Sequence, residues 1–490
     1  MNVPVPMPMP VPVPVPDMVS RTAAAHPGRV AIEDDRGALT YGDLVRRAVS
    51  GAAALDRAGP PGAPVCVCLP RGRDFVVAAL AAMLSGRPYA PVDPAHPRRR
   101  RRGVLDRLGP GAIPVSERSG LTPRELDRGG QEFRPARARA AYIVHTSGTT
   151  GTPKGVLVGH DSLANLVSWH RRTYRTSPRT RQLHTAGLGF DAAVWEIWPC
   201  LCAGGTLVVA PDEVRISPVE LVEFGRERAI DILFVPTPIA EMIVELDADD
   251  DIPWRTMLTG GDALRLRRLP RGWELVNHYG PAEATVCATR HPVGRVPDSG
   301  LPPIGRPIDG ARVVLVDPRG RPTPAGGTGE IHIGGRALAL GYHREPEETA
   351  RRFVTLPGLT GRWYRTGDLA VENACGELEF LGRLDDGQLQ VHGVRVEAAE
   401  IEAALLRHPR VHQAAVAIVG DTRALGALVV VSGPCPTPGE LRRLMSADLP
   451  GSAIPTLVVP GQRIPLTPNG KIDRPAVRRR LAQERKRSGR

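Results

Sequence analysis

The sequence predicts an α/β protein with a large, layered N-terminal domain and a small α+β domain at its C-terminus. Its 490 residues correspond to about three domain-sized units. From Val30 onward, short apolar runs alternate with Ala/Leu-rich stretches of helical character, as in layered α/β folds. A polar, turn-forming cluster at residues 382–387 then precedes a unit of roughly 100 residues. We therefore expect a large domain over residues 17–381 and a small one over 382–490.

The individual elements follow from local patterns. Residues 1–16 are dominated by alternating proline, which removes backbone donors and favours an extended, disordered tail. Apolar runs predict strands, and longer helical patterns predict helices. The expected strands are 65–69, 141–144, 156–158, 329–335, 411–419 and 428–431, and the expected helices are 75–83, one opening at residues 161–162, and 397–407.

The basic character of the chain comes almost entirely from arginine. Lys and Arg number 64 against 52 Asp and Glu, giving a net charge of +12, and Lys154, Lys471 and Lys486 are the only lysines. A lysine is therefore rarely a default surface residue in this sequence. The run Arg98–Arg102 predicts an exposed first helical turn, with a nucleic-acid or acidic-partner contact as the alternative. No aromatic residues interrupt the run, which disfavours single-strand binding.

Other features limit the cellular setting. No apolar run approaches the length of a membrane-spanning helix, and the N-terminus lacks the pattern of a secretory signal. The seven cysteines have no zinc or redox spacing, so we expect reduced thiols. These observations predict a cytoplasmic protein with no membrane contact.

A loop rich in Ser, Thr and Gly, residues 147–155, follows the strand expected at 141–144. Small residues leave backbone N–H groups able to converge on an anion, and Lys154 adds a charge suited to phosphate. Because Lys154 is preceded by Pro and followed by Gly, the loop is not a Walker A motif. It predicts a phosphate site of another kind, with an ordinary polar loop as the alternative.

Seven further segments extend the pattern along most of the chain. They are LTYxxL at residues 39–44, LSGRPYAPVD at 84–93, FDAAVWE at 190–196, NHYGPAE at 277–283, YRTGDL at 364–369, GRxD at 382–385 and NGKIDR at 469–474. In order and spacing they resemble the adenylate-forming superfamily, in particular the adenylation domains of nonribosomal peptide synthetases. The resemblance implies layered α/β subdomains plus a distorted β-barrel, with a small mobile C-terminal domain.

The resemblance also implies ATP and Mg²⁺ as cofactors. Residues assigned to ATP are Thr146, Ser147, Gly148, Thr149, Thr150, Gly151, Lys154, Tyr279, Asp368 and Arg383. Glu283 would hold Mg²⁺, and Lys471 would reach the substrate carboxylate and the α-phosphate. Lys471, Lys154 and Glu283 form the expected catalytic set, because joining two anions requires positioning and charge neutralisation.

The acid to be activated is indicated by a pocket carried over from the same family. Asp191 would pair with the α-ammonium of an amino acid, although an N-cap role is an alternative that does not exclude it. The other pocket positions are Ala192, Trp195, Phe234, Leu258, Gly260, His278, Val286, Cys287 and Lys471. This set suits an apolar side chain, and it favours leucine or another medium-sized aliphatic amino acid.

Several positions depart from the family pattern. Ala282 replaces the usual threonine beside Glu283, and Leu340 replaces an arginine before Gly341. Asp385 resembles the hinge about which the small domain rotates, although an apparent extra residue leaves Asp386 as an alternative.

The partner implied by the resemblance is a carrier protein. No fused carrier or condensation domain is recognisable, so we expect a free-standing enzyme that loads a carrier protein in trans. The positive charge suits an acidic carrier, and an MbtH-like helper protein is a further candidate partner. Nucleic acid is not expected as a partner. The competing interpretations are an acyl- or aryl-CoA ligase and a non-catalytic basic nucleic-acid-binding or scaffold protein.

Overall fold

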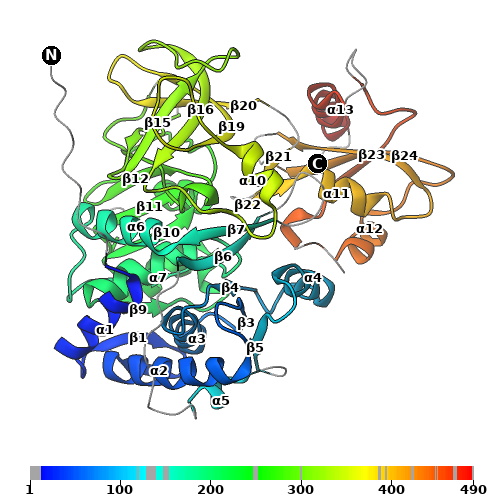
Figure 1. Ribbon diagram of the computed structural model, residues 1–490. Helices are drawn as coiled ribbons and strands as arrows, with labels where there is room; N and C mark the ends of the chain where they lie inside the picture. Colours follow the sequence, from blue (N-terminus) through cyan, green and yellow to red (C-terminus); the bar gives the residue numbers. More distant parts are fainter. Residues whose placement is uncertain are drawn as a thin grey trace.

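The computed structural model describes residues 13–117, 121–127, 139–146, 154–246, 252–297, 301–384, 388–391, 394–420, 424–446, 449, 451–466 and 472–487. It confirms the expected mixed α/β class, with large sheets below and a curled antiparallel sheet above (Figure 1). None of the helices in this part of the chain is long and apolar enough to span a membrane.

Two large sheets form the layered part of the molecule (Figure 1). Within the described residues, the first has nine strands in the order β14 (Arg306–Pro307), β13 (Thr289–Pro292), β12 (Glu274–Tyr279), β11 (Thr256–Gly260), β10 (Ile232–Pro236), β8 (Arg181–His184), β9 (Thr206–Val209), β1 (Val30–Asp34) and β2 (Gly37–Thr40). The second has six, in the order β17 (Gly341–Tyr342), β7 (Lys154–Gly159), β6 (Ala140–Thr146), β4 (Tyr89–Pro91), β3 (Val65–Cys68) and β5 (Ile113–Ser116).

A third, antiparallel sheet supplies the curled layer. Its strands are β15 (Ala311–Val316), β16 (Thr328–Gly335), β19 (Trp363–Glu372), β18 (Phe353–Val354) and β20 (Leu378–Arg383), which pairs with β19. The expected strands at 65–69, 141–144, 156–158 and 329–335 are confirmed as β3, β6, β7 and β16.

Helices fill the space between and around the sheets. They are α2 (Tyr41–Ala58), α3 (Arg73–Leu84), α5 (Pro123–Asp127), α6 (His160–Thr173), α7 (Ala192–Ala203), α8 (Pro218–Glu227), α9 (Thr237–Glu245) and α10 (Pro346–Arg352). The expected helix at 75–83 is confirmed within α3, and the one expected to open at 161–162 begins at His160.

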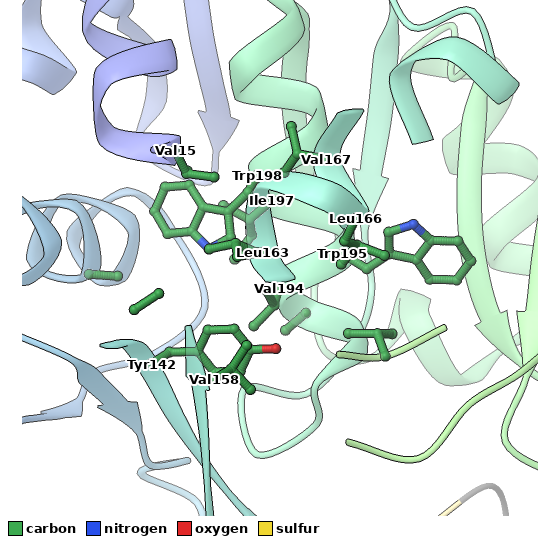
Figure 2. Close-up of a cluster of buried hydrophobic side chains, with 14 of the residues drawn as sticks. Val15, Tyr142, Val158, Leu163, Leu166, Val167, Val194, Trp195, Ile197 and Trp198 are labelled. Carbon is green, nitrogen blue, oxygen red and sulfur yellow. The ribbon is translucent and has the colours of Figure 1, made fainter. Parts of the chain in front are cut away.

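Helix α7 is the centre of the main core, because every one of its residues is buried. Figure 2 shows that its side chains point in several directions: Trp198 lies beside Val15, Trp195 lies towards Leu166, and Val194 faces Tyr142. Trp198 Nε1 donates to Tyr89 Oη at 2.9 Å. This packing on all sides fixes α7, and therefore its first turn, with respect to both large sheets.

The N-terminal prediction needs correction at one point. Helix α1 (Val15–Ala25) begins inside the segment expected to be a tail, and Val15 is completely buried in the main core. Pro16 stands at the start of the helix, where a missing N–H has no cost. The rest of the predicted tail, residues 1–12, lies outside the described residues.

The C-terminal elements pack around cores of their own. Strands β21 (Gln388–Val391) and β22 (Val394–Glu397) form a hairpin, and β23 (Val411–Val419), β24 (Ala424–Val431) and β25 (Leu457–Pro460) form a sheet covered by α11 (Ala398–Leu405), α12 (Pro438–Met445) and α13 (Arg474–Arg487). The two hydrophobic clusters here contain no residue before Leu389. The domain boundary near residue 382 stays a prediction that agrees with this separation.

The arginine run has a place within the fold. It forms the first turn of α4 (Arg98–Leu108), as expected. Arg100 forms an ion pair of 2.9 Å with Glu400 of α11, and both side chains are largely buried. One arginine of the run therefore joins the N-terminal part of the chain to the C-terminal part.

Candidate active site

The predicted substrate pocket lies at the carboxyl ends of three adjacent strands. Strands β10, β11 and β12 are parallel, with Pro236 opposite Gly260 and Gly260 opposite His278. The ends of parallel strands in such sheets are usual places for ligands. A Cβ on Gly260 would lie 2.5 Å from the His278 carbonyl oxygen, so this position admits no side chain.

The first turn of α7 completes one wall of this pocket. The Trp195 ring lies 4.8 Å from the His278 ring and 5.8 Å from the Phe234 ring, measured between centroids. Leu258 is opposite Phe234 in the sheet, and Ala192 begins the helix. The structure thus gathers predicted pocket residues from four separate segments into one apolar cluster.

Asp191 immediately precedes α7. Its side chain makes no capping hydrogen bond to the helix, so the N-cap interpretation receives no support. Burial, and secondarily the Asp191 charge, raises the pKa of the Tyr142 phenol and of the Cys287 thiol. The Asp191 carboxylate therefore lies close to both groups, at the edge of the predicted pocket.

A strained turn carries the remaining pocket positions. Thr285 and Val286 both have left-handed backbone conformations, with φ of 54° and 71°. Such conformations are unfavourable for β-branched residues and occur where surrounding structure enforces them. Here Thr285 Oγ1 donates to the Ala337 carbonyl at 2.7 Å. The turn brings Val286 and Cys287 back towards β12 after the short helix that carries Glu283.

Three predicted nucleotide residues meet at one carboxylate. Tyr279 donates its hydroxyl to Asp368 Oδ2 at 2.6 Å, and Arg383 Nη1 donates to Asp368 Oδ1 at 2.5 Å. Arg383 also donates to the Thr366 carbonyl, which fixes its guanidinium. Burial and the Asp368 charge raise the pKa of Tyr279, so it remains a neutral donor. The carboxylate is thereby held in one orientation, as recognition of two ribose hydroxyls would require.

Lys154 and Glu283 lie on either side of Tyr342. Lys154 Nζ forms an ion pair of 2.8 Å with Glu348 and lies 5.8 Å from the centre of the Tyr342 ring. The Tyr342 hydroxyl donates to Glu283 Oε1 at 2.6 Å. Thr146, at the end of β6, is opposite Lys154 in the sheet. The two ends of the predicted phosphate loop therefore lie side by side.

Other predicted residues lie outside the described part of the chain. They are Ser147, Gly148, Thr149, Thr150 and Gly151 of the loop, Lys471, and the hinge candidates Asp385 and Asp386.

The donor set fits magnesium bound together with a nucleotide. Among the described residues, no group of three or more His, Cys, Asp or Glu side chains could hold a metal by itself. Mg²⁺ bound with nucleotides commonly uses one or two carboxylates, phosphate oxygens and water. Glu283, buried but beside Lys154 and Tyr342, is a suitable single carboxylate for that arrangement.

Three residues of the site were not singled out from the sequence. Tyr342 contacts Glu283, Glu348 pairs with Lys154, and Tyr174 lies 2.6 Å from His278 Nε2. None belongs to a segment whose spacing indicates chemistry by itself. Each is brought to the site from a distant part of the chain by the packing of the sheets.

A buried histidine behind the pocket gives a prediction for acid stability. His170 is fully buried, and burial lowers its pKa to about 3. An unfolded histidine titrates near 6.5, so below that pH the unfolded chain binds the proton and the unfolding free energy falls. At pH 5 this costs about 2 kcal/mol relative to pH 7. In His170→Phe, we expect the loss between pH 7 and pH 5 to be smaller by that amount in urea unfolding. An identical loss in both proteins would contradict this.

Comparison with known proteins agrees with this geometry. The model of the AMP-binding enzyme family matches residues 19–128 and 114–343, and that of the AMP-binding enzyme C-terminal domain matches residues 400–471. The chain therefore belongs to the AMP-binding, adenylate-forming enzymes. Within them it is an adenylation domain of the nonribosomal peptide synthetase type.

Individual relatives support this placement. One of the linear gramicidin synthase proteins from Brevibacillus parabrevis is 40% identical over 94% of this chain, which spans only 10% of that protein. Phosphinothricin tripeptide synthetase PhsC from Streptomyces viridochromogenes is 35% identical over 99% of this chain, which covers 46% of it. The chain thus spans less than half of these relatives.

Solved structures share the fold. A nonribosomal peptide synthetase protein containing adenylation and PCP domains has a TM-score of 0.81 and 30% identity, over 96% of this chain and 84% of that one. The amide bond synthetase McbA from Marinactinospora thermotolerans, 24% identical, has a TM-score of 0.82 over 96% of this chain and all of that one.

Proposed function

We propose that this domain activates a medium-sized aliphatic amino acid, with leucine as the first candidate, and loads it onto a carrier protein. In the first step a carboxylate oxygen of the amino acid attacks the α-phosphorus of ATP, and the bond to pyrophosphate breaks. In the second step the phosphopantetheine thiol of the carrier attacks the acyl carbon. AMP leaves with the bonding electron pair, and the thiol proton is released.

The observation that carries the proposal is an acidic side chain at the head of an apolar pocket. Asp191 precedes α7, and the rings of Trp195 and Phe234 lie a turn further on, 5.8 Å apart. A carboxylate here can pair with an α-ammonium group, while an apolar wall would leave a charged substrate side chain unpaired. An acid without an amino group would leave Asp191 without that partner, which disfavours a CoA ligase for simple carboxylic acids.

The other side chains have roles in positioning. Asp368, oriented by Tyr279 and Arg383, binds the ribose hydroxyls. Residues 147–151 and Lys154 hold the phosphates, and Lys471 neutralises the carboxylate and the α-phosphate. Mg²⁺ on Glu283 would offset phosphate charge. Asp385 serves as the hinge between the two steps.

The proposed protein partner is an acidic carrier protein supplied in trans. The net charge of +12 favours association with an acidic partner. Relatives of known structure contain adenylation and PCP domains in one chain. An MbtH-like helper remains part of the proposal, and so does a cytoplasmic location.

The test is amino-acid-dependent ATP–pyrophosphate exchange with the proteinogenic amino acids and Mg²⁺. We expect exchange with leucine or a close aliphatic neighbour. Preference for a charged or polar amino acid would contradict the pocket assignment but keep the enzyme class. Exchange with simple carboxylic acids alone would favour the CoA-ligase alternative.

A further inference from the structure

His278 is the residue of the predicted pocket wall whose chemistry depends most on its surroundings. It is nearly fully buried at the end of β12, 4.8 Å from Trp195 between ring centroids. An imidazole can present an aromatic face, a donor or an acceptor to a neighbouring group. Which of these a substrate meets depends on the tautomer and on the partners of the two ring nitrogens.

The partners of His278 determine its tautomer. Nδ1 lies 3.2 Å from the carbonyl oxygen of Thr259, which can only accept, so Nδ1 carries the proton. Burial lowers the pKa of His278 to about 3, so the ring is neutral near pH 7 and Nε2 is an acceptor. The Tyr174 hydroxyl, 2.6 Å from Nε2, therefore donates to it.

Tyr174 is itself fixed in place from outside the pocket. It follows the last turn of α6, and its backbone N–H donates to the carbonyl of His170 at 2.9 Å. Its own carbonyl accepts from Arg255 at 2.6 Å, and its ring packs against His170 at 4.9 Å. The phenol is almost completely buried. It can therefore satisfy His278 without moving when a substrate binds.

We propose that Tyr174 is a specificity-determining positioning residue, which occupies Nε2 of His278 so that the imidazole offers a substrate side chain no unused polar atom. The proposal rests on the proposed function of amino-acid activation and deepens it. A substrate side chain that must donate a hydrogen bond finds its acceptor already taken. Leaving a polar group unpaired in a buried pocket is unfavourable, so an apolar side chain is preferred.

The substitution Tyr174→Phe tests this directly. It removes only the hydroxyl and leaves Nε2 as a buried acceptor without its donor. Asparagine has nearly the shape of leucine, and its amide N–H groups can donate to that nitrogen. We expect the ratio of kcat/KM for leucine over asparagine to fall about five- to tenfold, mainly through a lower KM for asparagine. Valine and threonine form a second pair of matched shape, and the ratio should move in the same direction.

Two controls separate this role from general loosening of the core. Tyr89→Phe removes another buried tyrosine hydroxyl, which accepts from Trp198 on the same helix as Trp195. It should leave the ratio unchanged. His278→Phe keeps an aromatic ring but removes both nitrogens, and in that background Tyr174→Phe should have no effect on the ratio. An equal change in Tyr89→Phe, or a persistent effect in the His278→Phe background, would overturn the proposal.

The outcomes distinguish this proposal from the function on which it rests. A wild-type enzyme that uses asparagine as well as leucine would overturn the apolar pocket altogether. A wild-type preference for leucine that Tyr174→Phe leaves intact would overturn only the role of Tyr174. A readout without substrate is the nitrogen-15 spectrum of histidine-labelled protein, in which the Nε2 signal absent from His278→Phe should shift in Tyr174→Phe. An unshifted signal would overturn the hydrogen bond itself.

Discussion

Replacing Asp191 with alanine is expected to lower kcat/KM for leucine-dependent exchange by roughly thirty- to several-thousand-fold, a loss of about 2–5 kcal/mol. The carboxylate precedes the buried helix α7, which is fixed on all sides by core packing. It is thus held at the pocket edge without a capping bond to that helix. Without it, the substrate ammonium would lose its proposed partner and remain poorly solvated. Exchange kinetics at several leucine concentrations measure the effect.

The discriminating substrate is 4-methylpentanoate, which is leucine without its amino group. The wild-type enzyme should strongly prefer leucine over this acid, and the Asp191→Ala enzyme should lose most of that preference. Asp309→Asn is a matched control, because Asp309 pairs with Arg172 on the surface, where both side chains are more than half exposed. Retained discrimination in Asp191→Ala would contradict an ammonium contact.

Local sequence patterns predicted the elements that position the site. The apolar runs that became β3, β6 and β7 are short and bounded by turn-forming residues, so their type could be assigned without knowledge of the fold. Helix α1 was missed in part because alternating proline dominates the local composition. The burial of Val15 depends on its contact with Trp198, far along the chain (Figure 2).

The candidate site divides in the same way. Residues within dense motifs, such as Asp191, Tyr279 and Asp368, could be named from the sequence. Their partners could not, because Tyr174 is 104 residues from His278, and Tyr342 is 59 residues from Glu283. No periodicity links such positions, and only the register of the sheets brings them together.

The arginine run illustrates a different difficulty. In a chain whose basic residues are almost all arginine, composition cannot separate a solvated run from a contact surface. The buried ion pair between Arg100 and Glu400 distinguishes one member of the run. Burial raises the pKa of Glu400, and the guanidinium of Arg100 opposes that rise. The pair therefore belongs to the contact between α4 and α11.

The largest loss of stability is expected for Glu196→Ala, at about 3–5 kcal/mol in urea unfolding. Glu196 is almost completely buried, and it contacts His184 Nδ1 at 2.5 Å. It also accepts from the backbone N–H groups of Thr185 and Ala186 and from the Thr185 hydroxyl. Removing the carboxylate would leave several buried donors without an acceptor. Glu347→Ala, an exposed carboxylate on α10, is the control and should change stability by less than about 0.5 kcal/mol.

Glu196 also connects stability to the proposed chemistry, because it ties the end of β8 to α7 at both ends of the segment that carries Asp191. Glu196→Gln preserves the volume but replaces one acceptor oxygen by a donor, so we expect an intermediate loss of stability. Below its unfolding midpoint, this variant should have a higher KM for leucine with a smaller change in the KM for ATP. Equal changes in both KM values would indicate a general loss of folded enzyme, whereas a selective change indicates displacement of Asp191.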